Sequence, residues 1–314
     1  MKFNQTTIDR QLYRKTFLLF FLLLSFNSYA KLEIEKINNY VYALVGETSQ
    51  RNPENFGNNS THGVVITTEG VILIDSGGSY LGANEIHQTI KQLTDKPIKI
   101  VINTGGQDHR WFGNEYFQQL EAQVITSVKA SLDHKNREDE QITRISRLIG
   151  SSFDKTNPSY ANQTFDKKLK IQMGDSELHL FHFGPAHTQG DIIVWMPKER
   201  VMFSGDVVFV NRTLSIGPAK DINSWINVFE EMLKFNPKFI VPGHGHLTNT
   251  EEATKDTYDY LVHLRDSVRK IIDNDGDMIE ATNINQDKYS YLKNFDSIAK
   301  RNAQWVFEIL EFED

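Results

Sequence analysis

The sequence predicts an α/β domain followed by a region that contains only helices. Between residues 31 and 247, short runs of β-branched and aliphatic residues alternate with segments of helical periodicity, which is typical of an α/β fold. After His246 the β-type runs stop, and apolar residues recur only at helical spacing. We therefore expect one main domain over 31–247 and a helical C-terminal extension over 248–314.

Residues 1–30 have the features of a secretory signal peptide. Basic residues come first, an apolar run over 17–24 follows, and Ser28-Tyr29-Ala30 places small residues where a signal peptidase cuts. The apolar run is well short of the roughly 20 residues needed to cross a bilayer. We expect cleavage near Ala30, no membrane attachment of the mature chain, and a periplasmic or secreted location.

The composition limits the metal chemistry and the partners. The chain contains no cysteine, so any metal ion must be held by His, Asp or Glu. The formal net charge is −7, and removal of residues 1–30 makes the chain more acidic, because they carry more basic than acidic residues. A net charge of this sign gives no basis for binding nucleic acid or anionic lipid over the whole surface, which leaves only a local basic patch as an alternative. We therefore expect a small-molecule partner.

The first half of the main domain is predicted to contain four strands and a helix. Four consecutive aliphatic residues at 71–74 indicate a strand covered on both faces. The run at 98–102 indicates another buried strand, which leads directly to Asn103. The other early elements are strands over 40–45 and 63–67 and a helix over 81–93.

The second half begins with a long charged helix over 127–149 that ends at Gly150. Its charges run from Asp133 to Glu140, which fits a solvated surface helix or a flap over a site. The polar stretch 151–166 is expected to be a loop. Further strands are predicted over 169–173, 178–183, 192–196 and 201–203, followed by a helix that Asp221 caps.

In the C-terminal extension, Thr248 and Glu251 fit a capping box at the start of a helix. Apolar residues then recur on one helical face from Tyr258 to Ile272. The chain has no internal repeat and no Gly-Ser linker, so we expect the extension to pack on the main domain.

Four segments combine turn residues with side chains that bind metals. They read NTGGQDHRWFGN at 103–114, GPAHTQGD at 184–191, FSGD at 203–206 and VPGHG at 241–245. His187, Asp206 and His244 lie beside glycines or at strand ends, where a side chain projects into a cleft. Imidazole and carboxylate ligands that leave one position open suit a catalytic zinc ion.

Together these segments resemble the metallo-β-lactamase superfamily, whose first loop reads NT, then HxHxDH, then xxGN. The resemblance implies a four-layer αββα sandwich over 31–247. GGQDHR stands in place of HxHxDH, as in a divergent exported subgroup. Aligned without gaps, Gly105, Gln107, His109 and Arg110 occupy the positions of the first His, the second His, the Asp and the third His.

Members of the family have two metal sites, and the resemblance implies that this chain lacks most ligands of the first one. The first site would use Gly105, Gln107 and His187, of which only His187 is a good ligand, so it is expected to be empty or weak. His187 is then available as a general base or to orient a water molecule.

The second site retains His109, Asp206 and His244 as ligands, while Arg110 cannot bind a cation because its guanidinium stays protonated. This set partly resembles the single-zinc subclass of the family. We expect one zinc ion, with iron as an alternative, since two His and one carboxylate also suit ferrous iron.

A second alignment, with gaps, makes Asp108 and His109 the Asp-His pair of the loop. Asp108 is therefore kept with His187 as a candidate catalytic residue. His109, Asp206 and His244 are candidate ligands in both alignments.

Three other residues are expected to support the site. Asp75, which ends the strand at 71–74, either orients a ligand His or caps a turn. Asp191 would position His187 or a proton. Arg110 either binds an anionic group of the substrate or pairs with Asp75 or Asp108.

Three functions remain open from the sequence. The favoured one is a mononuclear metallohydrolase acting on an ester, thioester, lactam or sulfate ester. The second is a non-catalytic descendant of the fold that binds a ligand or a partner. The third is an iron-dependent sulfur dioxygenase.

Overall fold

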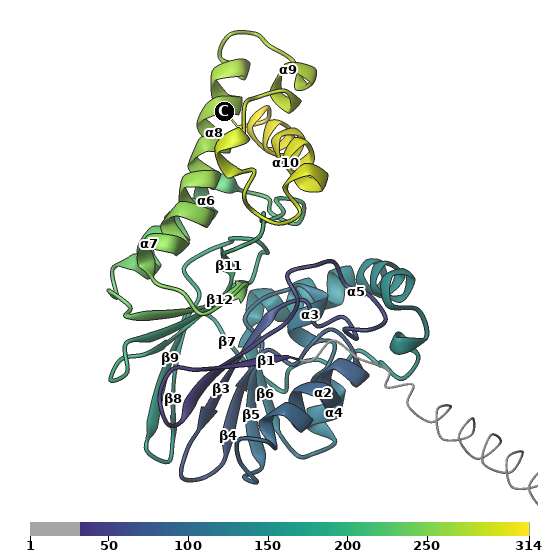
Figure 1. Cartoon of the computed structure of the whole chain (residues 1–314), viewed down its shortest axis with the longest axis vertical. Helices are drawn as coiled ribbons and strands as arrows, with labels where there is room; N and C mark the ends of the chain where they lie inside the picture. Colours follow the sequence, from purple (N-terminus) through teal and green to yellow (C-terminus); the bar gives the residue numbers. More distant parts are fainter. Residues whose placement is uncertain (1–31, 314) are drawn as a thin grey trace, which may run out of the picture.

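The computed structural model describes residues 32–313, so the expected signal peptide lies outside the described residues. Two β-sheets pack face to face with helices on both outer faces, and further helices stand at one end of the sandwich (Figure 1). This is the expected four-layer αββα arrangement with a C-terminal helical extension. Within the described part of the chain, no helix has the length and apolar character needed to span a membrane.

The first sheet contains seven strands in sequence order, antiparallel from β1 to β4 and parallel from β4 to β7. Its strands are β1 Glu33–Lys36, β2 Val41–Val45, β3 Thr61–Ile66, β4 Val71–Ile74, β5 Ile98–Ile102, β6 Gln123–Ser127 and β7 Gln163–Phe165. β7 lies in the polar stretch expected to be a loop. It forms because its backbone pairs with β6, an edge interaction that hydrophobic periodicity does not reveal.

The second sheet has the order β12-β11-β10-β9-β8, and only β11 and β12 are parallel. Its strands are β8 Lys168–Met173, β9 Ser176–Phe181, β10 Ile193–Met196, β11 Val201–Phe209 and β12 Phe239–His244. β11 is longer than the predicted 201–203 strand. Its extra residues carry Asp206 past a break in register at Gly205, where the chain turns towards the site.

Four apolar clusters form the core of the described residues, and three of them hold the layers together. Side chains alternate along β2, so that Val41, Ala43 and Val45 face the second sheet while Leu44 faces the outer helices. The outer core of the first sheet includes helices α2 Tyr80–Ile90 and α4 Asn114–Gln118. The third core joins the second sheet to α6 Ile222–Leu233, which Asp221 caps as predicted.

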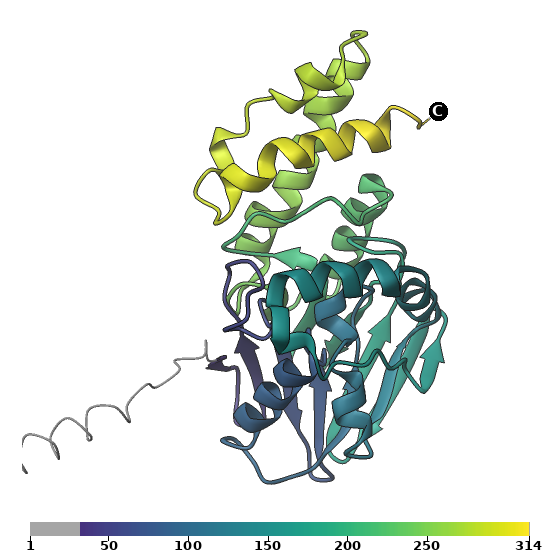
Figure 2. The same cartoon turned by 90° about the vertical axis from the view of Figure 1, so that its right-hand side faces the viewer.

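The C-terminal extension shares this third core and so packs on the main domain. Its helices are α7 Thr250–Ala253, α8 Asp259–Ile272, α9 Met278–Thr282 and α10 Phe295–Leu310, with a π-helical turn between α7 and α8. Figure 2 shows them gathered at the same end of the sandwich in a second view. The predicted capping box at Thr248 is wrong: Asn249 caps α7, accepting from the backbone N–H groups of Glu251 and Glu252.

Candidate metal centre

The loop after β5 is fixed at both ends by buried polar contacts. Asp75 accepts hydrogen bonds from the Thr104 backbone N–H at 2.7 Å and from the Thr104 hydroxyl at 2.8 Å. Asn103 and Asn114 exchange amide hydrogen bonds of 2.9 Å, which close the loop on itself. Between them, the one-turn helix α3 (Asp108–Trp111) carries His109. Asp75 therefore supports the loop and contacts no ligand His.

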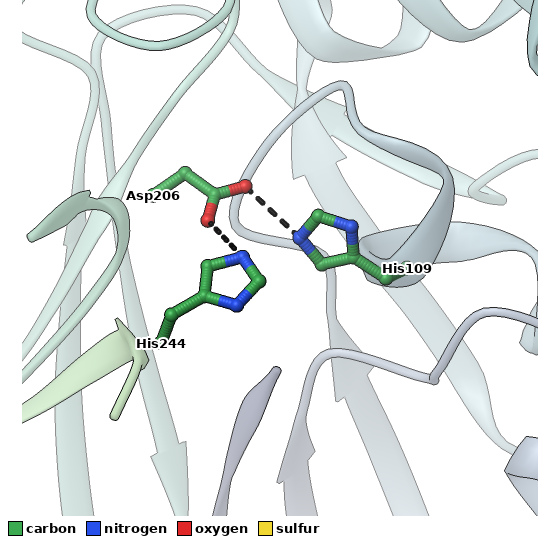
Figure 3. A group of neighbouring side chains, drawn as sticks. All are labelled: His109, Asp206 and His244. Carbon is green, nitrogen blue, oxygen red and sulfur yellow. Dashed lines mark hydrogen bonds and ion pairs between the residues drawn. The ribbon is translucent and has the colours of Figure 1, made fainter. Parts of the chain in front are cut away.

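Three buried side chains from distant segments converge beside this loop (Figure 3). His109 comes from α3, Asp206 from β11 and His244 from the end of β12. His109 Nε2 lies 3.2 Å from Asp206 Oδ2, and His244 Nε2 lies 3.3 Å from Asp206 Oδ1. One ligand atom from each residue lies within 4.8 Å of the other two, and no other His, Asp and Glu group in residues 32–313 does so.

This arrangement fits a zinc ion in its spacing and in its donor chemistry. Zinc bonds of roughly 2.0–2.1 Å in tetrahedral geometry place neighbouring ligand atoms about 3.3 Å apart. Burial and the nearby Arg212 guanidinium hold the pKa of His244 well below its usual range, so its imidazole is neutral. Burial alone would raise the pKa of Asp206, but Arg110 and His109 hold it well below its usual range.

Contacts behind the two imidazoles fix their orientation. His244 Nδ1 lies 2.7 Å from the backbone carbonyl of Asn59, which can only accept a hydrogen bond. His109 Nδ1 lies 3.1 Å from Asp108 Oδ1. In His244 the proton is therefore on Nδ1, and the lone pair of Nε2 is directed at the centre. His109 Nδ1 also contacts Arg51 Nη2, so a guanidinium and a carboxylate hold this ring from behind.

Asp108, a candidate catalytic residue in the sequence, is placed behind His109 and away from the cavity. It is fully buried, and its oxygens bind Arg51 Nη2 at 2.6 Å and Arg144 Nη2 at 3.0 Å. Burial would raise its pKa, but these two guanidinium groups hold the pKa well below its usual range. Asp108 is thus a charged residue that orients His109, and its position does not support direct catalysis.

Arg110 is also turned away from the cavity. It is fully buried and binds Asp206 through Nε at 3.1 Å and Nη2 at 2.6 Å, while Nη1 binds Asp75 at 2.9 Å. The expected pairing with Asp75 is present, and pairing with Asp108 is not. Because all its nitrogens are used inside the protein, the alternative role of Arg110 in binding an anionic substrate is not supported.

The centre opens into a cavity of about 520 Å³. His109, His187 and His244 line it together with residues of α10, including Arg301 and Trp305. The C-terminal extension therefore shapes the space next to the centre.

A family model described as the Metallo-beta-lactamase superfamily matches residues 57–244, more than half of the chain. The chain belongs to this superfamily. This match confirms the resemblance seen in the sequence. The relatives support the prediction that the protein is a metal-dependent hydrolase.

Relatives in this superfamily are similar at modest identity. A "Metallo-beta-lactamase type 2" of Elizabethkingia meningoseptica is 26% identical over 218 residues, covering 68% of this chain and 78% of that protein. The corresponding protein of Bacillus cereus is 24% identical over 193 residues, covering 60% and 68%. A "2,4-dinitroanisole O-demethylase subunit alpha" of Nocardioides sp. (strain JS1661) is 24% identical over 177 residues, covering 56% and 49%.

Solved structures of the superfamily show the same fold. A metallo-beta-lactamase from Pontibacter korlensis has a TM-score of 0.60 at 22% identity, covering 74% of this chain and 99% of that one. The DIM-1 metallo-beta-lactamase has a TM-score of 0.57 at 18% identity, covering 74% and 98%. The family model ends at residue 244, so the C-terminal helices lie beyond the matched region.

The two positions that correspond to the missing ligands of the first metal site, Gly105 and Gln107, are closely surrounded by other residues. A Cβ atom built on Gly105 would lie 2.2 Å from Asp191 Oδ1, so no larger residue fits there without movement. Gln107 Oε1 accepts a hydrogen bond from Arg137 Nη1 at 3.1 Å. A guanidinium group therefore binds the one side chain that could have replaced a ligand.

His187, the third residue of that first site, lines the cavity without joining the group of three ligands. Its ring packs between Phe209 and Trp225, and no residue in the described range bonds its buried Nδ1 atom. Burial lowers the pKa of His187 to about 3. At neutral pH it is an uncharged side chain with a free polar atom.

Asp191 positions the loop that carries His187 and makes no direct contact with that ring. It accepts a hydrogen bond from the Thr188 backbone N–H at 2.7 Å and one from the Thr188 hydroxyl. The Thr188 hydroxyl oxygen in turn accepts from the Gly106 N–H at 2.9 Å, which links the two loops. Burial and Asp206 raise the pKa of Asp191 to about 8.

Sequence reasoning missed Arg51 and Arg212, two buried cavity residues with no motif around them. Both lie in loops, and one signal was available. Each arginine comes shortly after a predicted strand, Arg51 after 40–45 and Arg212 after 201–203. Arg212 also follows the candidate ligand Asp206 on the same segment.

Proposed function

We propose that this protein is an exported mononuclear metallohydrolase that binds one zinc ion through His109, Asp206 and His244. The observation that carries the proposal is that one buried three-ligand set is complete while the first site of the superfamily is blocked at Gly105 and Gln107. Export is supported by the signal-peptide features of residues 1–30.

When bound, a zinc ion in such a site lowers the pKa of a water molecule and polarises a carbonyl or similar oxygen. The protein's own residues prepare the centre for that chemistry. Asp108 and the Asn59 carbonyl contact the Nδ1 atoms of the two ligand imidazoles and hold the rings in orientation. Arg110 holds both oxygens of Asp206, so its carboxylate cannot rotate.

His187 is the residue best placed to contact a substrate or a water molecule without binding the ion. With a pKa of about 3 it is a weak base at neutral pH, so we assign it an orienting role. Its free Nδ1 atom can form a hydrogen bond to a ligand in the cavity. The proposed substrates are esters, thioesters, lactams or sulfate esters small enough for the cavity.

Metal analysis of the purified mature chain tests the proposal. We expect about one zinc per chain in the wild type, as for a single three-ligand site, and none in His244→Ala. His263→Ala is the matched control, because His263 lies on α8, and its Nε2 contacts only the Asn285 carbonyl at 2.7 Å.

A panel of the four substrate classes should show hydrolysis that depends on the retained zinc. Two tightly held ions per chain, or zinc retained by a folded His244→Ala variant, would overturn the proposal. Iron in place of zinc would instead support the dioxygenase hypothesis.

A further inference from the structure

We propose that Thr257, a residue of the C-terminal extension, is a positioning residue of the metal centre. It acts through Phe209, whose ring lies against the proposed ligand His244 and against His187. The inference rests on the proposed metal-binding function and goes beyond it, because it makes the helical extension a working part of the centre.

Thr257 lies in the π-helical turn Thr254–Tyr258, between α7 and α8. Such turns are rare and occur frequently at functional sites. The Thr257 side chain is fully buried. Its hydroxyl accepts a hydrogen bond from the Phe209 backbone N–H at 2.9 Å and donates one to the Phe209 carbonyl at 2.5 Å. One side chain therefore satisfies both backbone groups of Phe209.

These two hydrogen bonds take the place of a neighbouring strand at the end of β11. Among residues 32–313, β10 pairs with β11 only from Val201 to Phe203, so no strand lies along this edge at Phe209. Backbone N–H and C=O groups that are buried without a partner destabilise a fold. The Thr257 hydroxyl supplies the missing partner and so fixes the position of the Phe209 backbone.

The residue before Thr257 continues this pairing. Asp256 Oδ2 accepts a hydrogen bond from the Asn211 N–H at 2.9 Å. Between Phe209 and Asn211, the Val210 N–H points the other way and donates to the His244 carbonyl at 3.0 Å. The π-helical turn therefore holds one edge of the segment 209–211, while the opposite edge of that segment is bonded to the backbone of His244.

The ring of Phe209 contacts two imidazoles beside the cavity. Its centroid lies 4.7 Å from that of His244, with the ring planes 20° apart, so the two rings are stacked. The centroid of His187 lies 5.5 Å away at 65°, an edge-to-face contact. The Asn59 carbonyl binds His244 Nδ1 in the ring plane, and Phe209 covers one face of the ring. A displaced Phe209 would leave His244 free to tilt away from Asp206.

This contact belongs to the extension of this chain. The family model ends at residue 244, so Thr257 lies beyond the matched region. The same turn fixes the aromatic ring behind a proposed ligand, which gives the added helices a reason to pack on β11. We therefore assign Thr257 to the support of the centre.

Thr257→Val removes the hydroxyl and nearly keeps the shape of the side chain. We expect it to weaken zinc binding roughly ten- to a hundredfold, the range for loss of a residue that supports a metal ligand. Competition with a chelator measures the affinity. Thr257→Ser keeps the hydroxyl and should bind zinc like the wild type. Thr254→Val is the matched control, because the Thr254 hydroxyl in the same turn donates only to the Thr250 carbonyl at 2.7 Å.

A double variant shows whether Thr257 acts through Phe209. Phe209→Leu removes the ring that stacks on His244. Two residues that support the same contact have non-additive effects. In the Phe209→Leu protein, Thr257→Val should therefore cause little further loss of zinc affinity. Fully additive losses in the folded double variant would overturn the route through Phe209.

Histidine NMR of the metal-free protein tests the positioning without zinc. A stacked aromatic ring shifts the resonances of the protons above its face, so the His244 ring protons report the position of Phe209. Thr257→Val should move the His244 and His187 signals, and Thr254→Val should leave them in place. Urea denaturation establishes that the compared variants are folded.

These measurements separate the positioning role from the proposed function. If the wild type holds no zinc but Thr257→Val moves the His244 signals, the proposed metallohydrolase fails and the positioning role stands. If the wild type holds zinc, and a folded Thr257→Val variant keeps both the zinc affinity and the His244 signals, the positioning role is overturned.

Discussion

The guanidinium of Arg110 binds both carboxylate oxygens of Asp206, with Nε 3.1 Å from Oδ2 and Nη2 2.6 Å from Oδ1. In the superfamily frame, Arg110 stands where a metal-binding His is expected. In this chain, Arg110 does not serve as a ligand and instead holds the carboxylate of the proposed ligand Asp206 in place. Arg110 Nη1 also pairs with Asp75, which in turn holds the motif loop through Thr104. One buried cation therefore connects a strand end, the loop and a proposed ligand.

Arg110→Met should strongly destabilise the metal-free protein. It leaves the buried carboxylates of Asp75 and Asp206 without a counter-ion, and breaking such a pair lowers the free energy of unfolding by about 3–5 kcal/mol. Urea denaturation measures the change. Arg110→Lys should recover only part of it, because an ammonium group cannot bind both oxygens of Asp206 in a fork. Wild-type stability in Arg110→Met would show that the two carboxylates are not held by this residue.

Asp108→Asn should weaken zinc binding although Asp108 is not a proposed ligand. The amide keeps the shape but loses the charge that orients His109, and loss of such a partner typically reduces metal affinity roughly 10–100-fold. Competition with a chelator gives the affinity. Asp133→Asn is the control, because Asp133 pairs with Arg137 and contacts no ligand His. Equal zinc affinity in wild type and Asp108→Asn would rule out the orienting role.

Restoring the superfamily ligands at Gly105 and Gln107 should not create a second zinc site. In a double variant with His at both positions, the Cβ of residue 105 would lie 2.2 Å from Asp191 Oδ1, and Arg137 occupies the space beside residue 107. We expect a single tight zinc equivalent and a stability loss of roughly 1–3 kcal/mol from overpacking. Calorimetric zinc titration checks the stoichiometry, and two tight equivalents would contradict the blocked-site interpretation.

His134 should make the protein less stable as the pH falls. Burial lowers its pKa to about 3, against about 6.5 in an unfolded chain. Between these values the unfolded chain binds a proton that the native protein excludes, so stability decreases with decreasing pH. From pH 7 to pH 5 this loss is about 2 kcal/mol.

His134→Gln removes that dependence and keeps a donor for the Gly105 carbonyl, which His134 Nε2 contacts at 3.0 Å. Urea denaturation at both pH values should show the variant gaining on the wild type by about 2 kcal/mol at pH 5. His263→Gln is the control and should follow the wild type. A constant difference between wild type and His134→Gln would contradict the prediction.

The sequence by itself determined where most elements lie and which residues meet. The buried strand at Ile98–Ile102 and the helix Ile222–Leu233 follow from local periodicity and from the Asp221 cap. The grouping of His109, Asp206 and His244 could be predicted because each follows a strand or turn with a readable motif. Their binding of a metal ion stays a prediction.

The tertiary structure alone decided what the side chains beside these ligands do. In the one-turn helix α3, successive side chains point in different directions, so Asp108 orients His109 while Arg110 holds Asp206. Arg51 and Arg212 face one cavity, and the segment before α10 forms hydrogen bonds with both of their loops. Contacts between residues far apart in the chain depend on packing and on the direction of each side chain, and local sequence patterns carry neither.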